Sequence, residues 1–184
     1  YDKAIGIVGT GKIGKVMINI AKGYGMNILA YDPYPDKNLD VNYVNLETLF
    51  KSSDIISLHC PLLKKNKHMI NADSIKKMKK GVIIINTSRG ALINAKDLYE
   101  GLFLRHVGAA CLDVYEEEAD VFYENRSNHI LDDVTLSMLI SLPNVIVTSH
   151  QAFLTKEALS AIATTTLENA INFFKGKENE TNRL

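Results

Sequence analysis

The sequence predicts an α/β fold, with a doubly wound, mostly parallel β-sheet flanked by helices. Short apolar runs of strand length alternate with segments of helical periodicity along most of the chain, which is typical of successive β-α-β units. Three glycines in a fixed pattern follow the first apolar run, where a strand gives way to a helix. Polar residues end the later apolar runs, and the carboxyl ends of parallel strands share one edge of the sheet.

The elements follow in order along the chain. Residues 4–8 have the composition of a strand buried on both faces. The spacing of apolar residues predicts that the next helix buries Ile13, Val16, Ile20, Ala21 and Tyr24, and Gly25 ends it. Further strands are expected at 26–32, 42–44, 54–59, 82–86, 107–114 and 145–148. Further helices are expected at 46–50, around 75–78, after Asn94 with Leu98 and Leu102 buried, around Leu136, Leu139 and Ile140 on one face, and from Thr155 to Gly176.

The three glycines are Gly9, Gly11 and Gly14, which form the pattern G-x-G-x-x-G. The first permits a tight turn, the second lets the backbone approach a pyrophosphate, and the third lets the helix pack closely on the strand. The helix N-terminus adds free N–H donors and a partial positive charge for the phosphates. The pattern therefore predicts a Rossmann-like dinucleotide site; the alternative is a glycine turn in an unrelated α/β domain.

Asp32 ends the second strand, eighteen residues after Gly14, which is close to the separation at which an acid meets the adenosine ribose. A carboxylate there accepts a hydrogen bond from a 2′-hydroxyl and repels a 2′-phosphate. The cofactor is therefore expected to be NAD and not NADP. Tyr31 and Tyr34 either flank the adenine or are partly exposed loop aromatics.

Composition excludes several classes of partner. The 184 residues suffice for one domain, or one domain and a fragment, and 21 basic residues balance 21 acidic ones. Nothing in this balance indicates nucleic acid or an anionic membrane as a partner. No apolar run has transmembrane length and no signal peptide is evident. The two cysteines, in strand-like apolar runs, are typical of reduced core residues, so a cytoplasmic protein is expected. Because the chain begins without methionine, we interpret it as a piece of a longer polypeptide.

The cysteines and histidines point to neither a disulfide framework nor a metal site. Cys60 and Cys111 lie in strand-like apolar runs and are interpreted as reduced core residues. No two histidines or cysteines have the spacing of metal ligands. His59 is interpreted as structural, and the remaining candidates outside the proposed site are interpreted as solvated: His68, His106 and His129.

Three polar residues suit hydride transfer on a 2-oxo or 2-hydroxy acid. Arg89 follows the fifth strand, and a guanidinium binds a planar carboxylate bidentately. His150 follows the last strand and suits proton exchange with the carbonyl oxygen. Glu118 is the best candidate in its acidic run for orienting that histidine. The alternatives are an ordinary surface arginine and a solvated acidic loop.

Four motifs together resemble the D-isomer-specific 2-hydroxyacid dehydrogenase family: GTGKIG at 9–14, NTSRG at 86–90, CLDVYEEE at 111–118 and SHQAFLTKEA at 149–158. The stretch from 120 to 133 resembles the D-lactate dehydrogenase branch. The resemblance implies that Arg89, Glu118 and His150 are the catalytic set and that Asp113 binds the nicotinamide carboxamide. The remaining cofactor-binding residues that it implies are Gly9, Thr10, Gly11, Lys12, Ile13, Gly14, Tyr31, Asp32, Pro33, Cys60, Pro61, Thr87 and Ser88.

The resemblance also implies an activity and a domain organisation. The expected enzyme interconverts pyruvate, or a similar 2-oxo acid, and its D-2-hydroxy acid with NAD(H), as a homodimer. Residues 1–150 would form the NAD-binding domain, and 151–184 a helical segment that returns to the substrate-binding domain. Most of that second domain precedes the first motif in the family, so we expect this chain alone to be inactive.

Two other functions fit the same residues. Dehydrogenases for 2-hydroxyisocaproate or 2-hydroxyglutarate belong to the same branch, and the missing domain largely sets their selectivity. A non-catalytic NAD-sensing scaffold, as in transcriptional corepressors, can retain the same three residues. Substrate turnover would indicate an enzyme, whereas NADH-dependent binding of a partner protein would indicate the non-catalytic scaffold.

Overall fold

The computed structural model describes residues 1–118 and 132–177, and the chain divides into two compact units, Tyr1–Ser149 and His150–Leu184. The boundary that the sequence predicts, between 150 and 151, lies one residue later. That the second unit belongs to a substrate-binding domain stays a prediction. Several regions interpreted above lie outside the described residues: His129, most of the 120–133 stretch and the end of the chain.

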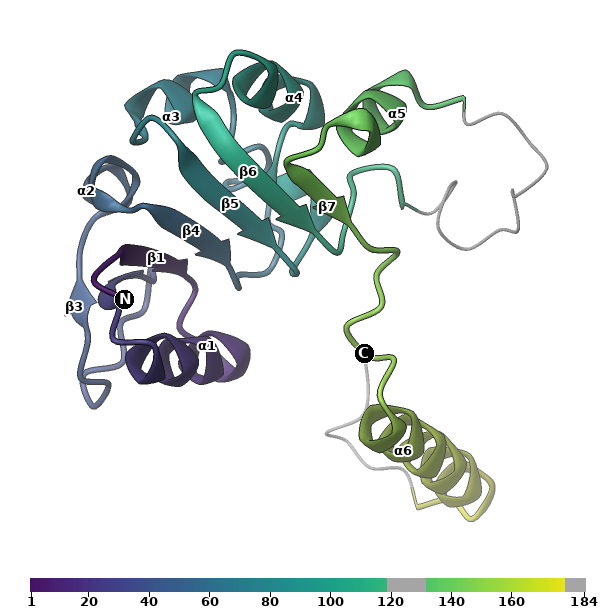
Figure 1. Ribbon diagram of the computed structural model, residues 1–184. Helices are drawn as coiled ribbons and strands as arrows, with labels where there is room; N and C mark the ends of the chain where they lie inside the picture. Colours follow the sequence, from purple (N-terminus) through teal and green to yellow (C-terminus); the bar gives the residue numbers. More distant parts are fainter. Residues whose placement is uncertain (119–131, 178–184) are drawn as a thin grey trace. The chain divides into compact units, whose positions relative to one another are not determined.

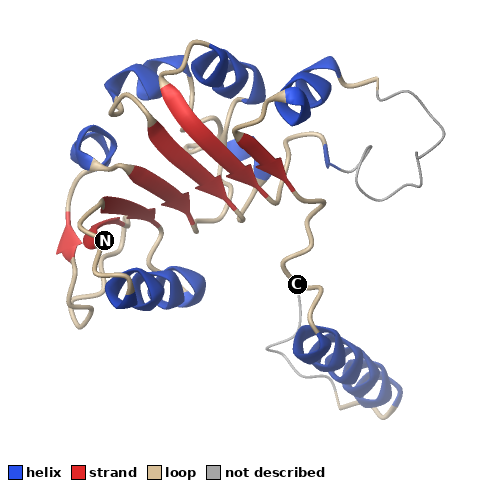
Figure 2. Ribbon diagram, in the orientation of Figure 1, coloured by secondary structure: helices blue, strands red, loops and turns tan. Residues whose placement is uncertain are grey.

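The first unit is built on a parallel sheet whose seven described strands lie in the order β3-β2-β1-β4-β5-β6-β7 (Figure 2). The strands are β1 (Ala4–Val8), β2 (Asn27–Tyr31), β3 (Asn42–Tyr43), β4 (Ile55–Leu58), β5 (Val82–Asn86), β6 (Val107–Leu112) and β7 (Val145–Val147). The chain moves outward from β1 through β2 to β3, then returns to the other side of β1 at β4. This reversal is the doubly wound topology that the sequence predicts, and folds of this topology bind their ligands at the carboxyl ends of the strands beside the reversal.

Helices cover both faces of this sheet (Figure 1). One face carries α2 (Leu46–Ser52), α3 (Ala72–Lys77), α4 (Ala95–Phe103) and α5 (Val134–Ser141), and the opposite face carries α1 (Lys12–Gly23) over β1 and β2. A short 3₁₀ helix, η1 (Gly90–Leu92), precedes α4. Asn94 caps α4 as predicted, because its side chain accepts a hydrogen bond from the Asp97 amide.

The core has two layers because side chains alternate across the strands. The larger layer lies between the sheet and α2–α5 and includes Ile56, Leu58 and Ile84. The smaller layer joins Ile5 and Ile7 of β1 to α1. Each fully buried isoleucine contributes about 1.5–3 kcal/mol, so both layers hold β1 in place and fix where its carboxyl end lies.

The predicted buried face of α1 is confirmed for Ala21 and wrong for its other four residues. The buried residues are Gly14, Ile18 and Ala21, whereas Ile13, Val16, Ile20 and Tyr24 are 48–69% exposed. The rotation of α1 about its axis is fixed by Gly14, which must lie against the turn at Gly9. This contact, and not the spacing of the apolar residues, determines which face of α1 is buried. In α5 the prediction fails for one residue, because Ile140 is exposed while Leu136 and Leu139 are buried.

The second unit contains α6 (Lys156–Phe174). Thr155 caps it by accepting a hydrogen bond from the Ala158 amide, and Gly176 follows it with a positive φ, both as predicted. No residue of α6 is buried. Among the described helices, none is both long enough and apolar enough to cross a bilayer.

Candidate active site

The carboxyl ends of five strands bring the predicted residues of the first unit to one edge of the sheet. Val8 pairs in register with Tyr31 and Leu58, and Asn86 pairs with Leu58 and Leu112. The residues that follow these strand ends are Gly9, Asp32, His59, Thr87 and Asp113. Their gathering at one edge is therefore confirmed.

The glycine-rich turn has the geometry that its three roles require. Gly9 has φ +96°, and a Cβ there would lie 2.6 Å from the His59 carbonyl oxygen. A Cβ on Gly14 would lie 2.0 Å from the Gly9 carbonyl oxygen, so no other residue lets α1 approach β1 this closely. A Cβ on Gly11 would meet nothing within 4 Å. The space that a pyrophosphate needs above Gly11 is therefore open.

The N-terminus of α1 faces this open space. Gly11 is its N-cap residue, and no side chain among the described residues caps the helix there. The amides of the first helical turn thus lack side-chain acceptors, so their N–H groups can donate hydrogen bonds to a bound anion. Lys12 and Ile13, which the resemblance also assigns to the cofactor, are the first residues of this turn and are exposed.

Asp32 is held close to the glycine-rich turn. Its Oδ2 accepts hydrogen bonds from the Thr10 amide (2.8 Å) and the Thr10 hydroxyl (3.1 Å), and its Oδ1 accepts from the Tyr34 amide (2.8 Å). The carboxylate is therefore oriented before any ligand arrives. Tyr31 is half-buried and packs on the larger core layer, while Tyr34 is 85% exposed. A contact of either ring with adenine stays a prediction.

His59 and Cys60 follow β4 beside the same turn. The His59 Nε2 lies 2.9 Å from the Ser57 hydroxyl, and burial lowers the pKa of His59, which favours the neutral ring. Burial likewise raises the pKa of the Cys60 thiol, so this cysteine stays protonated. The Cys60 carbonyl oxygen accepts a hydrogen bond from the Ser88 hydroxyl (2.6 Å), which ties the segment before Pro61 to the loop after β5.

The loop that carries Arg89 is anchored by Asn86, a buried residue that the sequence indicates only as the first residue of the NTSRG motif. Its Nδ2 donates to the Arg89 carbonyl oxygen (2.9 Å), and its Oδ1 accepts from the Ser88 amide (3.1 Å). The Arg89 side chain is exposed, with Nη1 donating to the Ser88 carbonyl oxygen (2.7 Å). An amide that ends an otherwise β-branched strand is the signal that indicates this anchor.

The segments carrying Arg89 and Glu118 pack directly on each other. A Cβ on Gly90 would lie 2.0 Å from the carbonyl oxygen of Tyr115, so the two backbones are in contact there. The Glu118 carboxylate accepts a hydrogen bond from the Tyr115 amide (3.1 Å). The structure thus brings together the two loops that were predicted to supply the guanidinium and the carboxylate.

The prediction that His68 and His106 are solvated is wrong. The His68 Nε2 lies 2.6 Å from the Glu116 carboxylate, and the His68 amide donates to the Ala91 carbonyl oxygen (2.8 Å), so His68 braces both loops. The His106 Nε2 contacts the Met78 carbonyl oxygen at 3.1 Å. Both rings are half-buried. Their partners are distant in sequence, which is why local context did not indicate them.

Asp113 and His150 complete the predicted set. Asp113 is buried after β6, its amide donates to the Asn86 carbonyl oxygen (2.9 Å), and its Oδ1 accepts from the Thr148 hydroxyl. His150 is the first residue of the second unit and has φ +53°. Its approach to Arg89 and Glu118 stays a prediction. No group of three or more potential metal ligands occurs in the described part of the chain.

Comparison with known proteins identifies the family. The family model for the D-isomer specific 2-hydroxyacid dehydrogenase, NAD binding domain, matches residues 1–152. The chain belongs to the D-isomer-specific 2-hydroxyacid dehydrogenase family. It is 49% identical over 180 residues to D-lactate dehydrogenase of Escherichia coli K12, covering 96% of this chain and 55% of that protein. The chain spans about half the length of the curated relatives it matches.

Solved structures of dehydrogenases share this fold. A pyruvate reductase of Chlamydomonas reinhardtii matches with a TM-score of 0.89 and 42% identity, over 94% of this chain and 54% of that one. A D-lactate dehydrogenase of Lactobacillus jensenii, solved with NAD⁺, matches with a TM-score of 0.87 and 33% identity, over 97% of this chain and 54% of that one.

NAD is the cofactor of this dehydrogenase domain, and its residues fit the molecule. The open space above Gly11 and the N-terminus of α1 suit a pyrophosphate. Asp32 already presents a carboxylate at the end of β2, where the adenosine ribose lies in such folds. Asp113, which the resemblance assigns to the nicotinamide carboxamide, is buried after β6, and its contact with the cofactor stays a prediction.

Proposed function

We propose that the protein is an NAD-dependent dehydrogenase that interconverts a 2-oxo acid and its D-2-hydroxy acid, with pyruvate and D-lactate as the first pair to test. The observation that carries the proposal is the packing of Gly90 on Tyr115, which sets the Arg89 loop against the Glu118 segment at the carboxyl edge. D-lactate dehydrogenase of Escherichia coli and the pyruvate reductase of Chlamydomonas reinhardtii are relatives whose names support this choice of substrate.

In the proposed reaction, each residue has a separate task. NADH supplies a hydride to the carbonyl carbon when it is bound. Arg89 binds the substrate carboxylate through two parallel N–H···O bonds and so orients the carbonyl. His150 donates a proton to the carbonyl oxygen, and Glu118 fixes the tautomer and orientation of that imidazole. In the reverse direction His150 accepts the hydroxyl proton.

The first experiment is a steady-state assay of the protein at its full natural length. We expect NADH oxidation with pyruvate, faster than with 2-oxoisocaproate or 2-oxoglutarate, and D-lactate as the product. Arg89→Lys keeps the charge but loses the bidentate geometry, so KM for pyruvate should rise about tenfold or more. Arg105→Lys is the matched control, because Arg105 is exposed and precedes β6 at the opposite edge of the sheet.

The rival function makes an opposite prediction. A protein that binds NADH, turns over none of the three acids and captures a partner protein only with NADH present would be the non-catalytic scaffold. The 184-residue chain alone should bind NADH without measurable turnover, and full pyruvate reduction by it would contradict that expectation. Assembly as a homodimer and a cytoplasmic location stay predictions, which sedimentation and fractionation would test.

A further inference from the structure

Tyr43, which neither the glycine motif nor the proposed reaction uses, lies in a hydrogen-bond network with Thr10 of that motif. It ends β3, where it pairs in register with Ala30 of β2, and its ring is half-buried. Its hydroxyl lies 2.9 Å from the Thr10 hydroxyl and 3.2 Å from the Asp36 amide nitrogen. The edge strand therefore contacts the glycine-rich turn through the phenol of Tyr43.

The direction of these hydrogen bonds is determined by the Asp36 amide, which can only donate, and the Asp32 carboxylate, which only accepts. The Asp36 amide can only donate, so the Tyr43 oxygen accepts there and its own proton is free for Thr10. The Thr10 hydroxyl accepts that proton and donates its own to Asp32 Oδ2 (3.1 Å). Each donor in such a chain polarises the next, so the Tyr43 hydroxyl strengthens the bond that Asp32 receives.

An ion pair braces the outer end of this network. The Lys15 Nζ lies 2.6 Å from the Asp36 carboxylate, and Lys15 lies on the first turns of α1. This pairing lowers the pKa of Asp36 and raises that of Lys15. Asp36 also caps its own turn by accepting from the Asn38 amide (2.9 Å). The turn that presents its amide to Tyr43 is thus held on two sides.

The network leaves one oxygen of Asp32 for a ligand. Oδ2 already receives two hydrogen bonds from Thr10, whereas Oδ1 receives only the Tyr34 amide among the described residues. A carboxylate oxygen can accept two hydrogen bonds, so Oδ1 retains capacity for a ribose hydroxyl. Fixing Oδ2 therefore fixes where Oδ1 points.

We propose that Tyr43 is a positioning residue for the cofactor: acting through the Thr10 hydroxyl, it orients Asp32 toward the adenosine ribose and so sets the preference for NAD over NADP. The proposal rests on the ribose role of Asp32 and is independent of the substrate. A 2′-phosphate gains nothing from an oriented carboxylate, so loss of the network weakens NADH binding more than NADPH binding.

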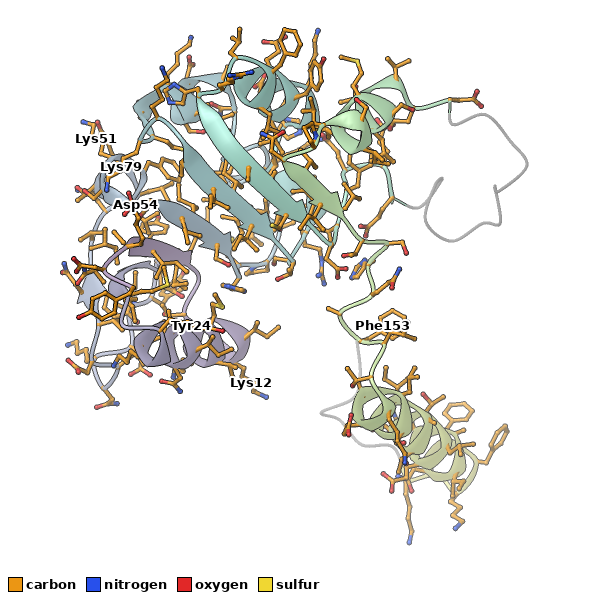
Figure 3. All side chains as sticks on the ribbon, viewed as in Figure 1. Lys12, Tyr24, Lys51, Asp54, Lys79 and Phe153 are labelled. Carbon is orange, nitrogen blue, oxygen red and sulfur yellow. The ribbon has the colours of Figure 1, made fainter. Side chains whose placement is uncertain are left out.

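The test compares dissociation constants for NADH and NADPH by fluorescence titration of the protein. Tyr43→Phe should raise the constant for NADH about three- to tenfold and change that for NADPH less, so the discrimination between them falls. Tyr24→Phe is the matched control, because Tyr24 directly follows α1 and is 69% exposed (Figure 3), and this substitution removes a hydroxyl outside the network. It should change neither constant.

Two further variants separate positioning from general damage to the fold. Thr10→Val should lower the discrimination as Tyr43→Phe does, whereas Thr10→Ser keeps the hydroxyl and should preserve it. The double variant Tyr43→Phe/Thr10→Val should discriminate no worse than Thr10→Val alone, since one residue acts through the other. Equal weakening of NADH and NADPH, or additive effects in the double variant, would overturn the proposal. Because the readout is binding, it is unaffected if the proposed reaction fails.

Discussion

Substituting Gly11 and Gly14 by alanine should produce two different defects, although the two glycines lie three positions apart in one motif. Gly11 has φ −67° and ψ −164°, which alanine adopts without strain, and its added Cβ meets nothing within 4 Å. The cost in the free energy of unfolding should stay within about 1 kcal/mol, because alanine is a poorer N-cap residue but restricts the unfolded chain.

Gly14→Ala instead forces two backbone segments apart. Its Cβ would lie 2.0 Å from the Gly9 carbonyl oxygen, where ordinary contacts begin at 3.4 Å. Because the Cβ position is fixed by its own backbone and its neighbour is a backbone carbonyl, no side-chain rotation can relieve the clash. We expect a loss of about 3 kcal/mol or more, which for a domain of this size lowers Tm by about 6–12 °C.

Thermal unfolding and NADH titration on the same samples distinguish the two defects. Gly11→Ala should keep its Tm but lose NADH affinity about tenfold or more, because its methyl group occupies the space for the pyrophosphate. Gly14→Ala should have a lower Tm than the parent protein, both with and without NADH. Unchanged NADH affinity in Gly11→Ala would refute the role of that open space, and an unchanged Tm in Gly14→Ala would refute the close-packing argument.

Three further substitutions test other parts of the structure. Gly90→Ala should lower kcat more than it weakens NADH binding, because it displaces Tyr115 and the segment leading to Glu118; equal losses in both would indicate general unfolding. His150→Asn should lower turnover at least about a hundredfold with the NADH dissociation constant unchanged, and a parallel loss of NADH binding would make His150 structural. Burial lowers the pKa of His59 below its usual 6.5, so the unfolded chain binds a proton at a higher pH than the folded one, and stability falls as the pH drops through about 6.5. His59→Gln should flatten that fall in urea titrations, and an unchanged pH dependence would assign it to other groups.

The strand ends and the glycine-rich turn were predictable because their signals are local. Apolar runs of strand length bounded by polar residues located Asp32 and Asp113, and the fixed spacing of Gly9 and Gly14 located the turn. The rotation of α1 was not predictable from apolar spacing, because the contact of Gly14 with Gly9 decides it.

Contacts between distant segments carried no local signal. The carboxylate of Glu116 lies far along the chain from His68, so the sequence around that histidine resembles any polar loop. Tyr43 lies in a two-residue strand, and its partner Thr10 belongs to a different β-α-β unit. Such pairs follow from the order of the strands, which periodicity alone does not give.

The central claim is that Arg89, Glu118 and His150 act together beside the nicotinamide. A crystal structure of the full-length protein with NADH and oxamate, an analogue of pyruvate, tests it most directly. We expect the Arg89 guanidinium to bind the oxamate carboxylate, and His150 to lie within hydrogen-bond distance of both the oxamate carbonyl oxygen and Glu118. An oxamate held by other residues, with His150 turned away from the nicotinamide, would contradict it.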